Sequence, residues 1–547
     1  MFIMIIMRIL LSILFFAMSG AIYAQKDTAK KQVIDIISSF KPVISNTPKV
    51  NFSATYLTAD TSKYIAPYSI PSLNLFFSYQ PVSLKPLALN KDSVLHLGLR
   101  NFLKVGYGNL SSPFASTSFS LGDGIKSLVN LSANYIALKG AIENQNYAQL
   151  NAKISGSYFT NTDEIFGSLG FNQQDYHFYG YDHSLVSFSE QDVLQHFDNF
   201  QGLVGFRNKV SNDLGITYSP LVDFNVFNNL HKLGENSIRI DVPVEKSLDD
   251  LFSVKLSVKA DINSYTSKNS IDHIQFNNSI FQLSPEAIYH SKSMLIHGGL
   301  TPAWVEGKFF LLPNFYGEAN VTNLDLILQA GYTGQFISNS YRNLSVINPY
   351  LHSLSFQRNT KETEGYVGFK SSAGKHFNFS AKISLINFNH LPLYINDSSS
   401  DNKAFLIGYE SSVNNFRFHG DVSFVNSDQF SLTSGITFNG YNQLKDNQKA
   451  WGTIPLEIIN SLRWQATTQL KIKTDCKIFS GGPYLLKNND QQNLSNGADL
   501  SVGAEFAINK NFSAWLDGNN LLNNKYERWH NYPVYGIHII GGLIIKF

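Results

Sequence analysis

Residues 536–547 read Gly-Ile-His-Ile-Ile-Gly-Gly-Leu-Ile-Ile-Lys-Phe, and this stretch has the alternation of a membrane-spanning β-strand. Successive side chains of an extended strand point to opposite faces. One face carries Tyr535, Ile537, Ile539, Gly541, Leu543, Ile545 and Phe547, and the other carries Gly536, His538, Ile540, Gly542, Ile544 and Lys546. A strand crosses a bilayer with roughly 9 to 11 residues, and the first face is apolar enough to meet lipid.

The opposite end of the chain predicts export. Within residues 1–24, an apolar run follows the single cation Arg8, and small residues precede a cleavage point before Gln25. This order is typical of a signal peptide. The single cysteine, Cys476, lies far from that point, so we expect neither a lipid anchor there nor an intramolecular disulfide.

The composition is that of an exported β protein in contact with lipid. Aromatic residues make up 14% of the chain, charged residues only 15%, and the formal net charge is +2. A soluble domain carries about 25% charged residues, whereas a barrel in lipid needs outward apolar side chains and aromatic girdles. No basic stripe is present, so we expect no nucleic-acid partner.

From residue 94 onward the sequence repeats a two-residue alternation broken by polar turns. In residues 252–262 apolar side chains alternate with Ser, Lys and Asp, and the same pattern recurs in residues 469–477. A row of charged side chains cannot be buried in a dry core without partners, so water must reach it. Short turns are predicted at 122–124, 161–163, 211–213, 306–308 and 509–511, and longer loops at 174–199, 335–362, 387–403, 440–453 and 480–497.

These patterns predict an all-β fold: a transmembrane antiparallel β-barrel over residues 94–547, with short turns on one rim and long loops on the other. An even strand number of roughly 16 to 22 fits the length, and we favour the upper part of that range. A soluble sandwich or propeller is the alternative, but the charged faces and the lack of a blade period disfavour it. Residues 25–93, rich in proline, are predicted to form a short irregular periplasmic or lumenal arm.

Two stretches near the end of the chain resemble the barrel portion of TonB-dependent receptors. The first is Ala450-Trp451-Gly452-Thr453-Ile454-Pro455-Leu456 with residues 461–464, and the second is residues 517–529, which resemble the last hairpin of that family. The resemblance implies a bacterial outer-membrane location, lipid and lipopolysaccharide as surroundings, and the barrel-insertion machinery as a partner. It also implies that Leu543, Ile545 and Phe547 form the assembly signal.

The family normally carries a plug domain ahead of the barrel, and no convincing plug is visible in residues 25–93. The resemblance therefore leaves two functions open. The first is uptake or passage of a solute, with a TonB-type energy coupler or a separate plug protein as partner. The second is a non-transporting platform for a surface or secretion complex.

The sequence contains no catalytic pattern. His-x-Ser-Asn-Gly, Gly-x-Ser-x-Gly, His-Glu-x-x-His, phosphate-loop and dinucleotide glycine motifs are all missing. We therefore expect neither an enzyme nor a cofactor.

Two groups of residues are candidates for solute contact. The first is an aromatic loop that could stack on a sugar or an apolar ligand, although such residues are also ordinary membrane-interface anchors: Tyr176, His177, Tyr179, Tyr181 and His183. Its spacing fits no closed zinc site, so no metal is expected. The second is a set of lumen-facing cations that could attract an anion, pair with Asp261 and Asp475, or simply be hydrated: Lys255, Lys259, Lys471 and Lys473.

Overall fold

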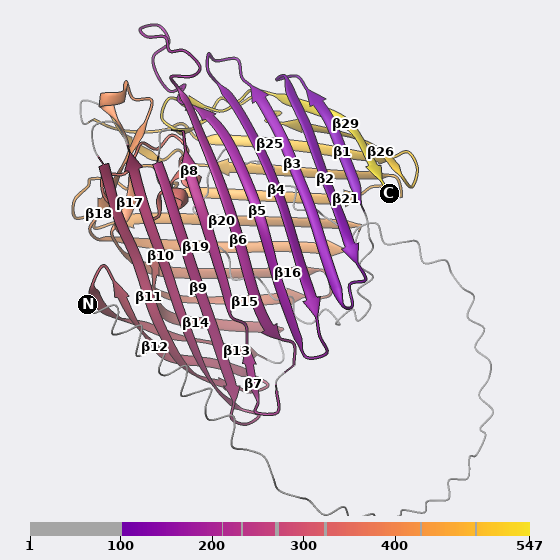
Figure 1. The fold of residues 1–547 in the computed structure, drawn as a ribbon, viewed down its shortest axis with the longest axis vertical. Coiled ribbons are helices and arrows are strands. Elements are labelled where there is room, and N and C mark those ends of the chain that lie inside the picture. Colours follow the sequence, from indigo (N-terminus) through magenta and orange to yellow (C-terminus); the bar gives the residue numbers. More distant parts are fainter. Residues whose placement is uncertain are drawn as a thin grey trace, which may run out of the picture. The chain divides into compact units, whose positions relative to one another are not determined.

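The computed structural model describes residues 101–547 with six short gaps, at 211, 231–232, 269–272, 322–324, 427–428 and 487–489. The predicted signal peptide (1–24), the predicted arm (25–93) and residues 94–100 of the predicted barrel lie outside the described residues. The described chain is almost entirely β-structure, as predicted (Figure 1).

One large antiparallel sheet forms the wall. Its first strands are β1 (Phe102–Gly108), β2 (Ser112–Gly122), β3 (Ser127–Lys139), β4 (Asn146–Phe159), β5 (Asp163–His177), β6 (Leu194–Asn208), β7 (Ile216–Tyr218), β8 (Leu221–Asn229), β9 (Leu233–Ser247), β10 (Phe252–Lys268), β11 (His273–His290) and β12 (Met294–Val305). The remaining strands are β13 (Lys308–Val321), β14 (Leu326–Ile337), β15 (Thr360–Ala373), β16 (Phe377–Asn389), β19 (Val413–Asn426), β20 (Phe430–Asn442), β21 (Leu456–Gln465), β22 (Leu470–Phe479), β25 (Gly497–Ala507), β26 (Phe512–Asn519) and β29 (His538–Lys546).

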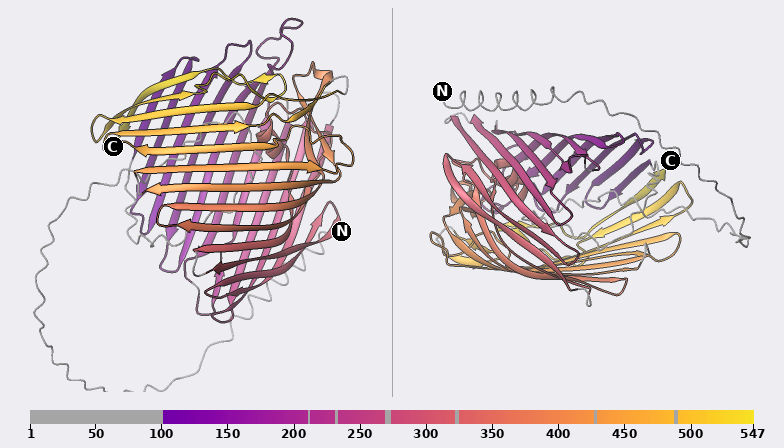
Figure 2. Two further views of the ribbon diagram at one scale, coloured as in Figure 1. Left: turned by 180° about the vertical axis from the view of Figure 1, so that it is seen from behind. Right: turned by 90° about the horizontal axis from the view of Figure 1, so that it is seen from below.

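The sheet closes on itself and becomes a barrel of 22 positions. Apart from β7, each wall strand pairs with the next wall strand along the chain, and β29 returns to pair with β1 from Phe102↔Lys546 to Gly108↔Ile540. The sheet has 23 strands, but β7 and β8 both pair with β9 and occupy one position. Pro220 lies at the interruption between them, where it offers no N–H to a ladder. The predicted closed barrel with an even strand number is confirmed, at the upper end of the range, and Figure 2 shows the wall from two further sides.

The two faces of the wall are divided as the alternation predicts. In β10, Val254, Leu256 and Val258 are exposed on the outside, while Lys255 and Lys259 pair with carboxylates on neighbouring strands. In β29 the predicted apolar face is outward, with Ile539 and Leu543 nearly half exposed, and the opposite face is buried. The outer face is therefore built for lipid and the inner face for water.

Connections alternate between two rims, because neighbouring strands are antiparallel. We call the rim with short connections the turn rim, and the other the loop rim. The predicted turn at 122–124 lies on the turn rim, where Asp123 Oδ1 accepts hydrogen bonds from three following backbone N–H groups. The predicted long loops all lie on the loop rim. One predicted turn, 306–308, is a short connection on the loop rim.

Exposed aromatic side chains form a girdle close to the turn rim. They come from strand ends spread around the barrel, which is where an aromatic side chain meets both lipid and water. The girdle includes Tyr158, Phe206, Phe252, Phe377, Trp464, Phe506, Phe512 and Phe547. This agrees with the high aromatic content of the chain.

The long loops contain small elements that are not part of the wall. They are α2 (Tyr341–Ile347), the 3-10 helix Ser398–Ser400, and the paired strands β17 (Leu391–Asn396) with β18 (Phe405–Glu410), β23 (Pro483–Leu485) with β24 (Gln491–Asn493), and β27 (Glu527–Trp529) with β28 (Tyr532–Pro533). No helix in the described part of the chain is long and apolar enough to span a membrane.

Candidate ligand-binding site

Three tyrosines from three different loops meet at the loop rim, and we call Tyr179, Tyr350 and Tyr532 the tyrosine triad. The rings of Tyr350 and Tyr532 are stacked with centroids 3.6 Å apart, and Tyr179 lies 4.8 Å from Tyr532. With β7 and β8 counted as one, these loops follow the fifth, thirteenth and twenty-first positions of the wall. Loops so far apart around the barrel can meet only by reaching across its mouth.

The loop between β14 and β15 is held against the inner wall through α2. Ser340 caps the helix by accepting a hydrogen bond from the backbone N–H of Asn343, as N-cap serines commonly do. The carboxylate of Glu235, on β9, accepts from the backbone N–H groups of Tyr341 and Arg342. The Tyr341 ring is fully buried. The helix therefore carries this loop into the barrel rather than away from it.

Burial makes the tyrosine triad a dry cluster. It raises the pKa of the Tyr179 phenol to about 12 and that of Tyr350 and Tyr532 well above the usual range. The Tyr179 hydroxyl donates to the carbonyl of Pro533 at 2.9 Å, and the Tyr532 hydroxyl donates to the carbonyl of Lys403. The phenols thus remain neutral hydrogen-bond donors that join the loops to one another.

The predicted aromatic ligand loop forms part of this cluster. Tyr176, Tyr179 and Tyr181 are each less than one-tenth exposed, and so is His177, whose Nδ1 lies 3.0 Å from the carbonyl of Asn146. Nε2 of His183 lies 3.0 Å from the carbonyl of Tyr179. In this closed arrangement the loop packs against the protein itself, and its contact with a ligand stays a prediction. No group of three or more metal-ligating side chains occurs in the described ranges.

The predicted lumen cations face inward and lie beside carboxylates. Nζ of Lys255 is 4.0 Å from Glu286, and Nζ of Lys259 is 3.8 Å from Asp241. Nζ of Lys473 is 3.0 Å from the carboxylate of Asp517. Lys471 lies opposite Glu505 in the β22–β25 register.

For Lys255 and Lys259, the neighbouring carboxylates are not the expected Asp261 and Asp475. Asp475 pairs with Arg463, whose Nη2 donates to the two carboxylate oxygens at 2.9 and 3.1 Å. Asp261 accepts a hydrogen bond from Asn263 on its own strand. The alternation shows which side chains face the lumen, but it does not give the register between neighbouring strands. The register determines which side chains lie opposite each other and can pair.

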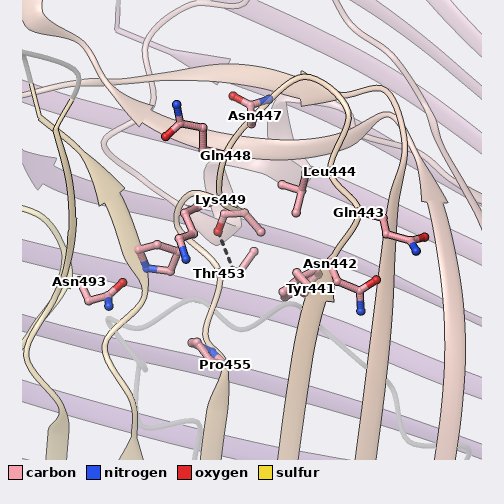
Figure 3. A pocket seen from close by; sticks show the side chains of 12 residues that line it. Tyr441, Asn442, Gln443, Leu444, Asn447, Gln448, Lys449, Thr453, Pro455 and Asn493 are labelled. Carbon is pink, nitrogen blue, oxygen red and sulfur yellow. Dashed lines mark hydrogen bonds between the residues drawn. The ribbon is translucent and has the colours of Figure 1, made fainter.

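A pocket of about 710 Å³ lies between the loop that follows β20 and the β23–β24 hairpin (Figure 3). Side-chain amides dominate its polar lining, and Lys449 is the only charged residue in that lining. The amides belong to Asn442, Gln443, Asn447, Gln448 and Asn493. Tyr441, Pro455 and Pro483 contribute apolar surface. The sequence prediction placed a loop over residues 440–453 but did not identify this pocket.

A buried carboxylate holds the loop that carries the pocket. Glu410, at the end of β18, accepts hydrogen bonds from the backbone N–H groups of Lys445, Asp446 and Asn447, and from the Asn447 side chain. Burial raises the pKa of the Glu410 carboxyl, but these donors outweigh burial and bring it below its usual value. The loop is therefore anchored by a charge.

The two sequence stretches that resemble TonB-dependent receptors contact each other beside the pocket. Nη2 of Arg528 donates to the carbonyl of Gly452 at 2.8 Å, and its guanidinium lies 4.0 Å from the Trp529 ring centroid. Burial lowers the pKa of Arg528 to about 10. Gly452 has φ +76°, a backbone conformation that favours glycine. Both stretches therefore serve to hold the loops together.

The predicted assembly residues lie at the seam of the barrel. Leu543 and Ile545 pair with Val105 and Leu103 of β1, and Phe547 is exposed on the outer surface. They are accessible from the lipid side, and their recognition by the insertion machinery stays a prediction.

The sequence matches no protein-family profile and no curated protein. Solved structures do match its fold. The FrpB iron transporter of Neisseria meningitidis superposes with a TM-score of 0.63 at 12% identity, covering 82% of this chain and 81% of its own. A mutant of the ferric enterobactin receptor PfeA of Pseudomonas aeruginosa, in complex with enterobactin, gives 0.62 at 12% identity with 82% and 81% coverage. FpvA of P. aeruginosa, bound to a pyoverdine, gives 0.61 at 9% identity with 82% and 71% coverage.

The closed wall and these likenesses define a class of fold: the large closed antiparallel β-barrel. Within that class, the fold of this chain is that of the 22-stranded TonB-dependent receptors, so the resemblance predicted from the sequence is confirmed for the barrel. The neighbours are transporters and receptors.

Proposed function

We propose that the protein lies in a bacterial outer membrane and takes up a solute through its barrel. The closed wall supports this best: its outer face is apolar, its inner face carries charged pairs, and long loops at one rim carry an open pocket. The iron transporter and siderophore receptors that share the fold support the same class of function. A TonB-type energy coupler or a separate plug protein is the partner this function calls for.

The tyrosine triad favours a second candidate, a non-transporting platform. Rings from three loops meet across the mouth, and a barrel closed at its loop rim would serve as a rigid surface for other proteins. Conductance separates the two candidates, because only a transport barrel gains a path when the closure is removed.

The test uses the purified full chain in planar lipid bilayers. The variant Tyr350→Ala/Tyr532→Ala removes two rings of the triad, and Tyr332→Ala, whose ring is 54% exposed on the outer surface of β14, is the matched control. We expect low conductance for the wild type and the control, and a several-fold higher conductance for the double variant.

We also propose that the arm predicted over residues 25–93 partly occludes the lumen, so deletion of residues 30–85 is combined with these variants. We expect each change to raise conductance, and the combination to raise it most. If the combined variant inserts as a folded barrel and still conducts no ions, the uptake proposal is wrong and the platform is supported.

A further inference from the structure

The lining of the pocket is chemically unusual for a site that holds an ion. Five of its twelve residues carry side-chain amides, none carries a carboxylate, and one carries an ammonium group. An amide both donates and accepts hydrogen bonds, so it matches a hydroxyl group, which does the same. A multiply anionic iron chelate would need several cations, and the pocket offers only Lys449.

The amides fall into a fixed group and a free group. Asn447 is fixed, since it donates to Glu410 and accepts from Trp451 Nε1 at 3.2 Å. Gln448 and Asn493 are exposed, and neither side chain has a hydrogen-bond partner among the described residues. Figure 3 shows Gln448 on the loop that follows β20 and Asn493 on the β23–β24 hairpin. The pocket lining therefore combines one amide held by the protein with two amides that remain available to a ligand.

The walls of the pocket are held in place by backbone contacts. The N–H of Gly452 donates to the carbonyl of Pro483 at 2.9 Å, and the N–H of Leu494 donates to the carbonyl of Gly482 at 3.0 Å. A Cβ atom at Gly482 would lie 2.2 Å from the carbonyl oxygen of Thr453, so the two loops approach as closely as glycine allows. A preformed pocket loses less entropy when it binds a ligand.

The apolar part of the lining suits the C–H face of a sugar ring. Tyr441 presents an aromatic ring, and Pro455 and Pro483 present flat aliphatic rings, next to the amides. A pyranose has this same division, with hydroxyl groups at its edge and C–H groups on its faces. A volume of about 710 Å³ lies within the range of sites for molecules of drug size.

We propose that this pocket binds a neutral oligosaccharide. The inference rests on the proposed uptake function, for which it names the class of solute. Such a sugar could come to the pocket as a soluble oligosaccharide or as the glycan of lipopolysaccharide, and binding measurements distinguish the two sources.

The experiment is calorimetric titration of the full chain in an amine-oxide detergent, because a maltoside detergent would itself offer sugar to the pocket. The probes are neutral hexasaccharides of glucose, mannose and xylose, a hexamer of galacturonate, and lipopolysaccharide with and without its outer glycan. We expect at least one neutral probe to bind. Gln448→Ala and Asn493→Ala should each weaken it roughly three- to tenfold, the effect of one lost hydrogen bond.

Gln491→Ala is the matched control, because Gln491 is an exposed amide on the same hairpin and does not line the pocket. It should leave affinity unchanged. Equal weakening by the control, preference for the galacturonate hexamer, or binding of no neutral probe would each overturn the inference. Binding of a neutral probe by a barrel that never conducts would instead overturn the uptake proposal and leave a glycan-binding platform.

Discussion

The barrel wall and the loop rim are built on opposite principles. In the wall, each of the 22 positions pairs with the next along the chain, and the seam between β1 and β29 joins the last position to the first. At the loop rim, Tyr179, Tyr350 and Tyr532 come from loops spread over most of the described chain and still share ring contacts. The wall thus depends on local alternation, and the loop rim depends on packing between distant segments.

The pairing of β1 with β29, the seam of the barrel, can be disrupted by a single added methyl group. A Cβ atom at Gly542 would lie 1.9 Å from the carbonyl oxygen of Val105, so Gly542→Ala forces the backbone of β1 and β29 apart. We expect a cost above the ~1 to 3 kcal/mol of ordinary overpacking, and loss of most of the closed barrel. The measurement is the mobility shift between unboiled and boiled samples in gel electrophoresis.

Gly365→Ala is the control for the seam, since its Cβ would meet only the Tyr332 ring at 3.8 Å. It should keep the mobility shift of the wild type. A normal shift for Gly542→Ala would mean that the seam is looser than the contacts indicate.

A smaller effect is expected from the assembly signal at the same seam. Phe547→Ser removes an exposed aromatic side chain whose ring centroid lies 5.7 Å from that of Phe119. The finished wall should tolerate the change, so we expect a lower inserted yield with unaltered stability of the inserted fraction. Surface labelling of whole cells measures the yield, and a wild-type level would exclude this role for Phe547.

The smallest effect is local to the loop rim and depends on pH. The pKa of Glu410 is lower in the folded protein than in the unfolded chain. The ionised carboxylate therefore contributes its full stabilisation of the loop at a pH above the unfolded-state pKa. This stabilisation is lost as the pH falls through the folded-state pKa. Glu410→Gln should remove this dependence and loosen the loop over residues 443–455, while the wall stays intact. Proteolysis of the loop between pH 7 and about 3 measures the effect.

Opening of the wild-type loop should increase toward the acidic end of that range, whereas Glu410→Gln should be cleaved at a rate that varies little with pH. Equal pH profiles for the two proteins would show that Glu410 does not anchor the loop.

The sequence predicts the wall well, because every needed signal lies within a few residues. Alternation in residues 252–262 identifies the two faces, and Asp123 between glycines identifies a turn. It does not predict the tyrosine triad, since nothing near Tyr179 indicates that Tyr350 and Tyr532 will meet it. The sequence does not predict the pocket for the same reason, because Gln448 and Asn493 come to line one pocket only through the packing of two loops.

The closure between β1 and β29 also orders events during synthesis. β29 is made after every other strand of the wall, yet it is the partner that β1 requires. A sheet that lacks β29 has two unpaired edges, which are templates for aggregation, and joining its ends costs the entropy of closing the longest loop in the wall. A chain truncated before β29 therefore keeps two unpaired strand edges exposed, and these edges are a feature that quality-control proteases can recognise.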